Sequence, residues 1–312
     1  MAKSVLNASH FQIEKAAFDY VEAKLWPNGP TCPHCGNADE KRIGRLNGKT
    51  TRLGLRKCYD CKKPFTVRQK TIFESSHLPL HLWLQVIHLM CASKKGISTN
   101  QIQRMLSCSM KTAWFLTHRI RAAMAAGTIT PMGSDGGTVE IDETYIGDKE
   151  LVTKRTKKGK SGHSGKRIVV SLVERNGGAR SFHVSQISKI AMSEIIEENL
   201  HPKSNLNTDE SRLYSDALLY VDQHESVYHT KGEYVRGTVH TNTVEGFFSI
   251  FKRGMKGVYQ HCSEKHLHRY LAEFDFRYSN RMALGIGDIV RADFALEGVK
   301  GKRLTYQTTT SV

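Results

Sequence analysis

The stretch Thr138-Val139-Glu140-Ile141-Asp142-Glu143-Thr144-Tyr145-Ile146 alternates apolar and polar side chains along the chain. That alternation is typical of a β-strand that buries one of its faces. Further strands are predicted at 167–173 and 179–185, and Asn176-Gly177-Gly178 between these two favours a tight hairpin turn. Residues 138–185 are therefore expected to supply three neighbouring strands of one sheet.

Helical periodicity appears directly after these strands. A helix is predicted at 188–199, a short strand at 204–209, and two amphipathic helices at 243–255 and 264–278. Three hairpin-linked strands followed by a helix and a further strand is the order of an RNase H-like sheet. We therefore expect an α/β fold in which helices flank a mixed RNase H-like sheet.

The N-terminal part of the chain carries two Cys-x-x-Cys pairs, Cys32-Pro-His-Cys35 and Cys58-Tyr-Asp-Cys61, separated by 22 residues. This is the spacing of a zinc ribbon. Zinc takes four ligands in a tetrahedron, and each pair can present two thiolates to the same ion. Buried packing cysteines or two disulfides are the alternative, which the flanking turn residues disfavour. The pattern predicts a structural Zn²⁺ bound by Cys32, Cys35, Cys58 and Cys61.

Two short helices are predicted at 98–106 and 109–120, each opened by a serine that can cap it. The very short link between them resembles a helix-turn-helix. Its second helix would offer Lys111, Thr112 and Arg119 to DNA. A small helical bundle without nucleic-acid contact is the alternative.

These patterns divide the chain into six expected segments. They are an N-terminal helix (1–25), a zinc ribbon (26–75), a helix-turn-helix region (76–126), a linker rich in Gly, Thr and Ser (127–137), an RNase H-like domain (138–290) and a C-terminal tail (291–312).

The charge balance points to a polyanionic partner. The 312 residues include 46 lysines and arginines against 30 aspartates and glutamates, for a formal net charge of +16. Double-stranded DNA fits this excess, because neutralised phosphates release counterions. A run at 151–167 is basic and lacks acidic residues, as expected of a loop that can contact a DNA backbone. No apolar stretch approaches the roughly 20 residues of a membrane span, so we expect a cytoplasmic protein.

Three acidic residues are candidates for holding catalytic cations. Asp142 lies in mid-strand, where a carboxylate is costly unless a charge pairs with it. Asp209 ends the short strand, and Glu245 lies in the first turns of the next helix. Carboxylates suit two Mg²⁺ or Mn²⁺ ions about 4 Å apart, the arrangement used for phosphodiester chemistry. Asp216 competes with Asp209, which we prefer because it follows the strand directly.

Three stretches resemble the three blocks of bacterial DDE transposases: 140–145, 208–214 and 240–254. With the zinc ribbon and the helix-turn-helix, the resemblance extends over nearly the whole chain. The family that the chain resembles is the insertion-sequence family called fifteen-ninety-five.

The resemblance implies roles for single residues. Asp142, Asp209 and Glu245 would hold the metal ions, and Lys252, with Arg253 beside it, would contact the transposon end. Asn242 remains an alternative third ligand, because some relatives use asparagine there.

The resemblance also implies an activity. The protein would bind the terminal inverted repeats of its own element, cleave DNA at those ends and transfer the freed 3′-OH to target DNA. It would act near the bacterial nucleoid as a homodimer or larger assembly, since two ends must be held. A zinc-ribbon DNA-binding regulator with a non-catalytic C-terminal domain and an RNase H-like host nuclease remain as rival functions.

Overall fold

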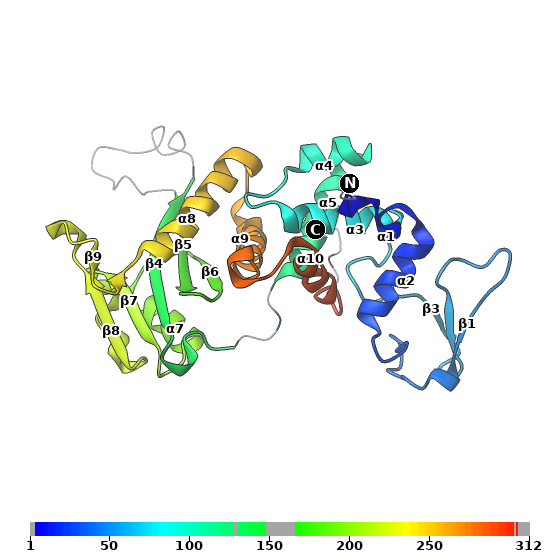
Figure 1. Cartoon of the computed structure of the whole chain (residues 1–312), viewed down its shortest axis with the longest axis horizontal. Coiled ribbons are helices and arrows are strands. Elements are labelled where there is room, and N and C mark those ends of the chain that lie inside the picture. Colours follow the sequence, from blue (N-terminus) through cyan, green and yellow to red (C-terminus); the bar gives the residue numbers. More distant parts are fainter. Residues whose placement is uncertain (1–3, 126, 128–129, 148–165, 303, 305–312) are drawn as a thin grey trace, which may run out of the picture. The chain divides into compact units, whose positions relative to one another are not determined.

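The computed structural model describes residues 4–125, 127, 130–147, 166–302 and 304. The chain forms two compact units (Figure 1). Unit 1 comprises residues 1–125 and 287–312, and unit 2 comprises residues 126–286. Most of the basic run expected at 151–167 lies outside the described residues.

Unit 2 is built on a five-stranded mixed sheet with the order β6-β5-β4-β7-β8. The first three strands pair antiparallel, whereas β7 pairs parallel with both β4 and β8. The five strands are β4 (Thr138–Ile146), β5 (Arg167–Glu174), β6 (Ala179–Val184), β7 (Asn205–Asp209) and β8 (Gln223–Val227). The strands and hairpin predicted between 138 and 209 are confirmed.

Helices cover both faces of this sheet. On one face, α7 (Lys189–Asn199) packs its Met192 and Ile196 against Val139 and Ile141 of β4. On the other face, α8 (Asn242–Gly254) and α9 (Glu264–Ser279) pack against β5. Because side chains alternate along a strand, Glu140 and Asp142 must lie on the α8 face.

The aromatic side chains of α8 are core residues, as their helical spacing predicts. Phe247, Phe248 and Phe251 are all buried with Phe274 of α9. In α9, Glu273 is fully buried rather than solvated, because it pairs with Arg277 and accepts a hydrogen bond from the Tyr259 hydroxyl.

Short elements complete unit 2. They are β9 (Val235–Arg236), β10 (Val239–His240), the π-helix η7 (Met255–Tyr259) and the 3-10 helices η3 (Ser134–Gly136), η4 (Arg212–Tyr214), η5 (Ala217–Leu219), η6 (His229–Lys231) and η8 (Met282–Leu284).

Unit 1 begins with helices that lead into a small antiparallel sheet. The expected single helix over the first 25 residues is interrupted at Ile13, which is extended between two helices. These N-terminal elements are η1 (Val5–Asn7), α1 (Ser9–Gln12), α2 (Glu14–Leu25), η2 (Glu40–Arg42), β1 (Ile43–Arg45), β2 (Arg56–Cys58) and β3 (Pro64–Phe65).

The rest of unit 1 is helical, with α3 (Leu80–Ala92), α4 (Thr99–Leu106) and α5 (Met110–Met124). The predicted serine caps are confirmed. Ser98 Oγ accepts from the Gln101 amide, and Ser109 Oγ accepts from the Thr112 amide. None of the described helices combines the length and hydrophobicity needed to cross a bilayer.

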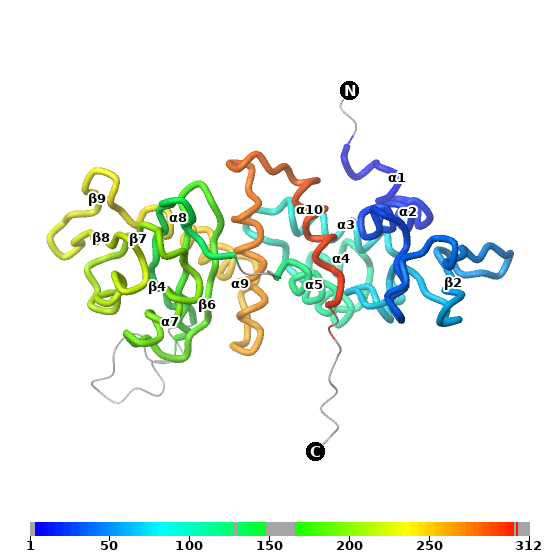
Figure 2. Tube along the Cα trace, turned by 90° about the horizontal axis from the view of Figure 1, so that it is seen from below, coloured from blue at the N-terminus to red at the C-terminus, as the bar shows by residue number. Residues whose placement is uncertain are grey.

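The C-terminal boundary differs from the expected one. Residues 288–297, which the sequence divides between the second domain and a tail, form helix α10 (Asp288–Glu297) of unit 1. Figure 2 shows α10 beside α3 and α5. The reason is burial: Ala295 and Leu296 are in the core, and the guanidinium of buried Arg291 donates to the carbonyl of Cys91 at 2.8 Å.

Candidate metal centres and nucleic-acid contacts

The four ribbon cysteines converge. Their sulfur atoms all lie within 4.8 Å of one another, with Cys32–Cys61 and Cys35–Cys58 distances of 3.7 Å. Four thiolates at about 2.3 Å from one tetrahedral ion are separated by about 3.8 Å. The arrangement therefore fits Zn²⁺, and because all four positions are sulfur, the ion would be structural.

Two tight turns present these sulfurs. After the first pair, Gly36 takes a φ of +80° and its amide donates to the Cys32 carbonyl at 2.9 Å. After the second pair, Lys62 takes a φ of +59°, and the Cys58 amide donates to the Lys63 carbonyl at 3.1 Å. The turns are local, so each pair is arranged by its own short segment.

The register of the large sheet brings two of the candidate carboxylates together. Glu140 pairs with Asn207 in the parallel β4–β7 ladder. The paired ladder ends there, and Asp142 and Asp209 each lie two residues further along their strands. Paired residues of neighbouring strands project to the same face of the sheet, and so do residues two apart along one strand. Both carboxylates therefore lie on the face that α8 covers.

Glu245 comes from α8 itself. It is in the first turn of the helix and exposed, and its Oε1 accepts from the Thr241 hydroxyl at 3.1 Å. Its charge reaches the strand carboxylates, since it contributes to the raised pKa of Asp142. The three predicted metal-binding residues are thus close enough for the charges of Asp209 and Glu245 to act on Asp142.

The pKa of Asp142 is strongly perturbed. Burial, followed by the charges of Glu143, Asp209 and Glu245, raises the pKa of Asp142 to about 7. Among the described residues, the cysteine cluster is the only group of three or more potential metal ligands within 4.8 Å. The carboxylates therefore form a wider arrangement of like charges, which bound cations would stabilise.

The competing residues are placed differently. Asp216 precedes η5 and forms an ion pair with Lys189 at 2.8 Å. Asn242 is the exposed first residue of α8, one turn before Glu245. Glu143 is half-buried, and its Oε2 accepts from the hydroxyl of buried Tyr214 at 2.9 Å.

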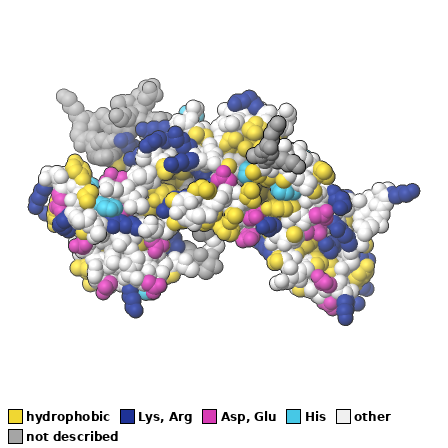
Figure 3. Space-filling model, viewed as in Figure 1, with side chains coloured by type: hydrophobic (Ala, Val, Ile, Leu, Met, Phe, Trp, Pro, Cys, Tyr) yellow, Lys and Arg dark blue, Asp and Glu magenta, His cyan; other side chains and the backbone are white. Residues whose placement is uncertain are grey.

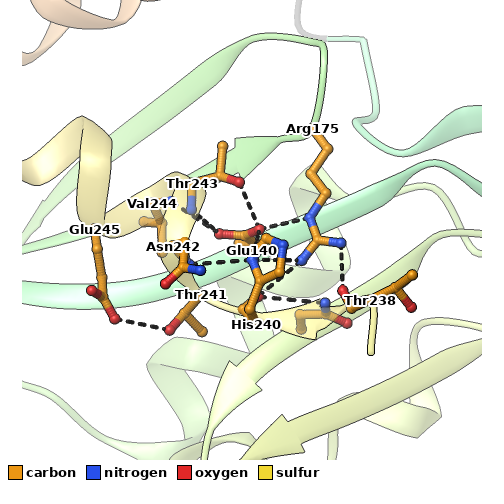
Figure 4. Close-up of polar contacts among 10 residues, drawn as sticks. Glu140, Arg175, Thr238, His240, Thr241, Asn242, Thr243, Val244 and Glu245 are labelled. Carbon is orange, nitrogen blue, oxygen red and sulfur yellow. Dashed lines mark hydrogen bonds and ion pairs between the residues drawn. The ribbon is translucent and has the colours of Figure 1, made fainter. Parts of the chain in front are cut away.

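Glu140 is a residue whose importance the sequence analysis missed. It is fully buried, and it accepts hydrogen bonds from the first turn of α8 and from Arg175 (Figure 4). The signal that could have found it is the strand alternation. Glu140 lies two residues before Asp142 on the same buried face, where a carboxylate needs partners.

The candidate DNA contacts on α8 are accessible. Lys252 and Arg253 are exposed in its last turn, as is Lys256 just beyond it. Figure 3 shows lysine and arginine side chains gathered on the surface over α8. In unit 1, Lys111 is exposed near the start of α5, and the Thr112 hydroxyl lies 2.9 Å from Ser109 Oγ.

Arg119 is buried, so its side chain is not available for the DNA contact that the sequence predicts. Its side chain is buried, and its Nη1 donates to the carbonyls of Ile72 at 2.7 Å and Glu74 at 2.9 Å. The guanidinium also lies 4.5 Å from the centroid of the Phe115 ring. The reason is that α5 is a central helix of unit 1, and its second half is buried on most sides.

Comparisons with known proteins identify both parts of the chain. Residues 135–279 match the ISXO2-like transposase domain, and residues 13–64 match the transposase zinc-ribbon domain. The chain is also 28% identical over 282 residues to a Halobacterium salinarum (strain NRC-1) protein described as an uncharacterized protein in transposable element ISH50. That alignment covers 86% of this chain and 91% of the relative. The chain thus combines the zinc ribbon and the transposase domain of the IS1595 family of insertion-sequence transposases.

Proposed function

We propose that this transposase binds the terminal inverted repeats of its insertion sequence and catalyses metal-dependent strand cleavage and strand transfer in unit 2. The observation that carries the proposal is the meeting of Asp142, Asp209 and Glu245 on one face of the sheet. Two of them lie two residues beyond the last pair of the parallel β4–β7 ladder, and the third is in the first turn of the helix that covers this face.

The proposed fold of unit 2 is RNase H-like. Three antiparallel strands are followed by a helix and then by two strands parallel to the first, in the order β6-β5-β4-β7-β8. In that topology β4 and β7 are neighbours at the centre of the sheet, and the end of β7 lies nearest the middle of β4. Ligands for two cations can then come from adjacent strands.

Asp142, Asp209 and Glu245 would hold two Mg²⁺ or Mn²⁺ ions, since oxygen ligands suit both. Bound cations would activate the attacking water or 3′-OH and stabilise the leaving oxygen. The protein's own contribution is to fix the three carboxylates and to hold DNA against them. Lys252 and Arg253, on the helix that carries Glu245, would bind phosphates of the transposon end.

Unit 1 is proposed to recognise the DNA ends. Its ribbon and the α4–α5 pair, used as a helix-turn-helix, would contact the inverted repeats, with Lys111 and Thr112 at the exposed start of α5. The net charge of +16 supports this partner. The active form would be a homodimer or larger assembly acting in the cytoplasm on nucleoid DNA, because a synaptic complex holds two ends.

The test is cleavage of a duplex that carries one transposon end. Asp142→Ala, Asp209→Ala and Glu245→Ala are each expected to abolish Mg²⁺-dependent cleavage while binding to the end persists. Asp216→Ala and Asn242→Ala are the matched variants and should retain cleavage. Normal cleavage by the Asp142→Ala protein would overturn the assignment.

The same assay separates the rival functions. A DNA-binding regulator would bind the ends without nicking them in Mg²⁺ or Mn²⁺. A host nuclease would cut without preference for inverted-repeat ends, and it would not join the freed 3′-OH to a second duplex.

A further inference from the structure

We propose that Glu140, held by Arg175, is a positioning residue that anchors the start of α8 to β4 and so sets Glu245 against Asp142. The inference rests on the proposed function for its consequence in catalysis. The anchor itself rests only on contacts within unit 2, which Figure 4 shows.

The Glu140 carboxylate caps α8 from a distant strand. Its Oε2 accepts from the backbone amides of Thr243 at 2.7 Å and Val244 at 3.0 Å. Its Oε1 accepts from the Thr243 hydroxyl at 2.7 Å. A carboxylate at this position satisfies amides that have no partner within the helix, and it also complements the positive end of the helix dipole.

The local sequence does not supply this cap. Thr241 occupies the capping position, but its side chain caps no helix amide. Its hydroxyl donates instead to Glu245 Oε1 at 3.1 Å. The residue that would ordinarily cap the helix is thus directed to the proposed metal ligand, and Glu140 takes over the capping role.

Arg175 completes the anchor and ties down the segment before the helix. Its Nε donates to Glu140 Oε1 at 2.7 Å. Its other nitrogens donate to the carbonyls of Thr238 at 2.6 Å and His240 at 3.0 Å, and His240 Nδ1 lies 3.2 Å from Glu140 Oε1. Glu140 is fully buried, so its charge requires such a partner, and the same guanidinium fixes the path into α8.

This geometry links two proposed metal ligands by a short route. Glu140 and Asp142 lie on one face of β4, about 7 Å apart along the strand. Val244, whose amide Glu140 holds, directly precedes Glu245. The carboxylates of Asp142 and Glu245 repel each other until cations bind. An anchor of charge-assisted hydrogen bonds would keep them at a fixed separation in the metal-free protein.

Unit 1 contains a second helix start that is capped by a distant glutamate paired with an arginine. No predicted metal ligand lies beside it, so it provides a matched control. Glu14 accepts from the amides of Leu80 at 2.8 Å and His81 at 3.1 Å, at the start of α3. Arg68 pairs with Glu14 at 3.1 Å and also donates to the carbonyls of Ser76 and Leu78. Both helices therefore begin on a distant glutamate that an arginine holds.

The experiment compares Glu140→Gln with Glu14→Gln in the full-length, zinc-loaded protein. Glutamine keeps the shape of glutamate, but an NH₂ group replaces one of its two acceptor oxygens. The hydrogen bonds that this oxygen accepted are therefore lost. Hydrogen exchange of the Thr243 and Val244 amides should accelerate roughly tenfold or more in Glu140→Gln. Mn²⁺ binding, followed by the electron paramagnetic resonance of free Mn²⁺, should weaken by about 10–100-fold.

Glu14→Gln should instead accelerate exchange at Leu80 and His81 and leave Mn²⁺ affinity unchanged. Thr243→Val, which removes a single hydroxyl contact to Glu140, should weaken Mn²⁺ binding less than Glu140→Gln does. It also keeps the test available if Glu140→Gln does not fold. Cleavage by Glu140→Gln should recover in part at saturating Mn²⁺, whereas cleavage by Asp142→Ala should not.

Unchanged amide exchange in Glu140→Gln would overturn the anchor. Faster exchange with wild-type Mn²⁺ affinity would overturn its role in positioning Glu245. Failure of the proposed function gives a different result, in which Asp142→Ala binds Mn²⁺ as well as the wild-type protein does.

Discussion

The zinc ribbon of unit 1 and the proposed carboxylate site of unit 2 are assembled in opposite ways. The ribbon sulfurs lie within 4.8 Å of one another, and four thiolates are enough to fill the tetrahedral coordination of Zn²⁺. The carboxylates come from two strands and a helix, and they include a group whose pKa is raised to about 7. A closed site of this kind holds a fold together, whereas an open one leaves room for a substrate.

The two sites differ in how much they depend on the rest of the molecule. Each cysteine pair is arranged by its own turn, and the small sheet only has to bring two turns together. The carboxylates depend on the register of β4 and β7 and on the anchoring of α8 at Glu140. The open site is therefore sensitive to residues that touch no metal.

The largest expected effect is the loss of a ribbon ligand. Cys58→Ser should abolish stoichiometric zinc and unfold the ribbon, because structural zinc contributes on the order of 10 kcal/mol to folding. Zinc content and calorimetry would measure this, with the unfolding of unit 2 unchanged. Cys108 lies outside the ribbon, so the Cys108→Ser protein should keep the ribbon zinc. Retention of zinc by Cys58→Ser would contradict the closed four-thiolate site.

Selective removal of zinc should separate the two sites functionally. A soft zinc chelator is expected to abolish binding to transposon ends, because the recognition module loses its fold. Nonspecific nicking in Mn²⁺ should survive, since the carboxylates are hard oxygen ligands in the other unit. Gel-shift and plasmid-nicking assays on one preparation would measure both. Equal loss of binding and nicking would argue against this division of labour.

The raised pKa of Asp142 predicts a stability that depends on pH. In the metal-free protein its folded pKa is about 7 against an ordinary 3.8, so the folded state binds the extra proton between these values. The free energy of unfolding should therefore fall as pH rises through this window. Asp142→Asn removes the free-energy cost of ionising this buried carboxyl. It should therefore stabilise unit 2 by up to about 4 kcal/mol at pH 8.

Thermal unfolding of unit 2 in Mg²⁺-free buffer at pH 4 and pH 8 would test this. The stabilisation of unit 2 by Asp142→Asn should be absent at pH 4. Saturating Mn²⁺ should stabilise only the wild-type protein. Asp216→Asn, in an exposed ion pair, should show no such gain. A variant Asp142→Asn that is less stable than wild type at pH 8 would contradict the raised pKa.

The smallest expected effects distinguish two basic residues of α5. Arg119→Ala should lower the free energy of unfolding by about 2–4 kcal/mol, because it leaves two buried carbonyls without a donor. Lys111→Ala should leave the free energy of unfolding unchanged. It should lower the magnitude of the slope of log affinity for DNA against log salt concentration by about 1. Denaturation and salt-titrated binding would measure these. Reversed roles would mean that the buried end of α5 contacts DNA.

The ribbon ligands, four of the five strands of the large sheet and the serine caps of α4 and α5 were readable from the sequence, because each depends on neighbours a few residues away. The fifth strand, β8, was not predicted. The family resemblance is confirmed by the matching domains. The assignment of Asp142, Asp209 and Glu245 as metal ligands remains a prediction, although the sheet brings these residues to one face.

Other features depended on packing between distant segments. Arg119 and Glu273 have charged side chains that periodicity favours on the surface, yet their partners bury them. The return of α10 to unit 1 and the capping of α8 by Glu140 likewise join residues far apart in the chain. Local pattern specifies which elements form and which face is apolar. Only the closed tertiary structure decides which charges find partners inside, because burial and pairing are properties of the assembled core.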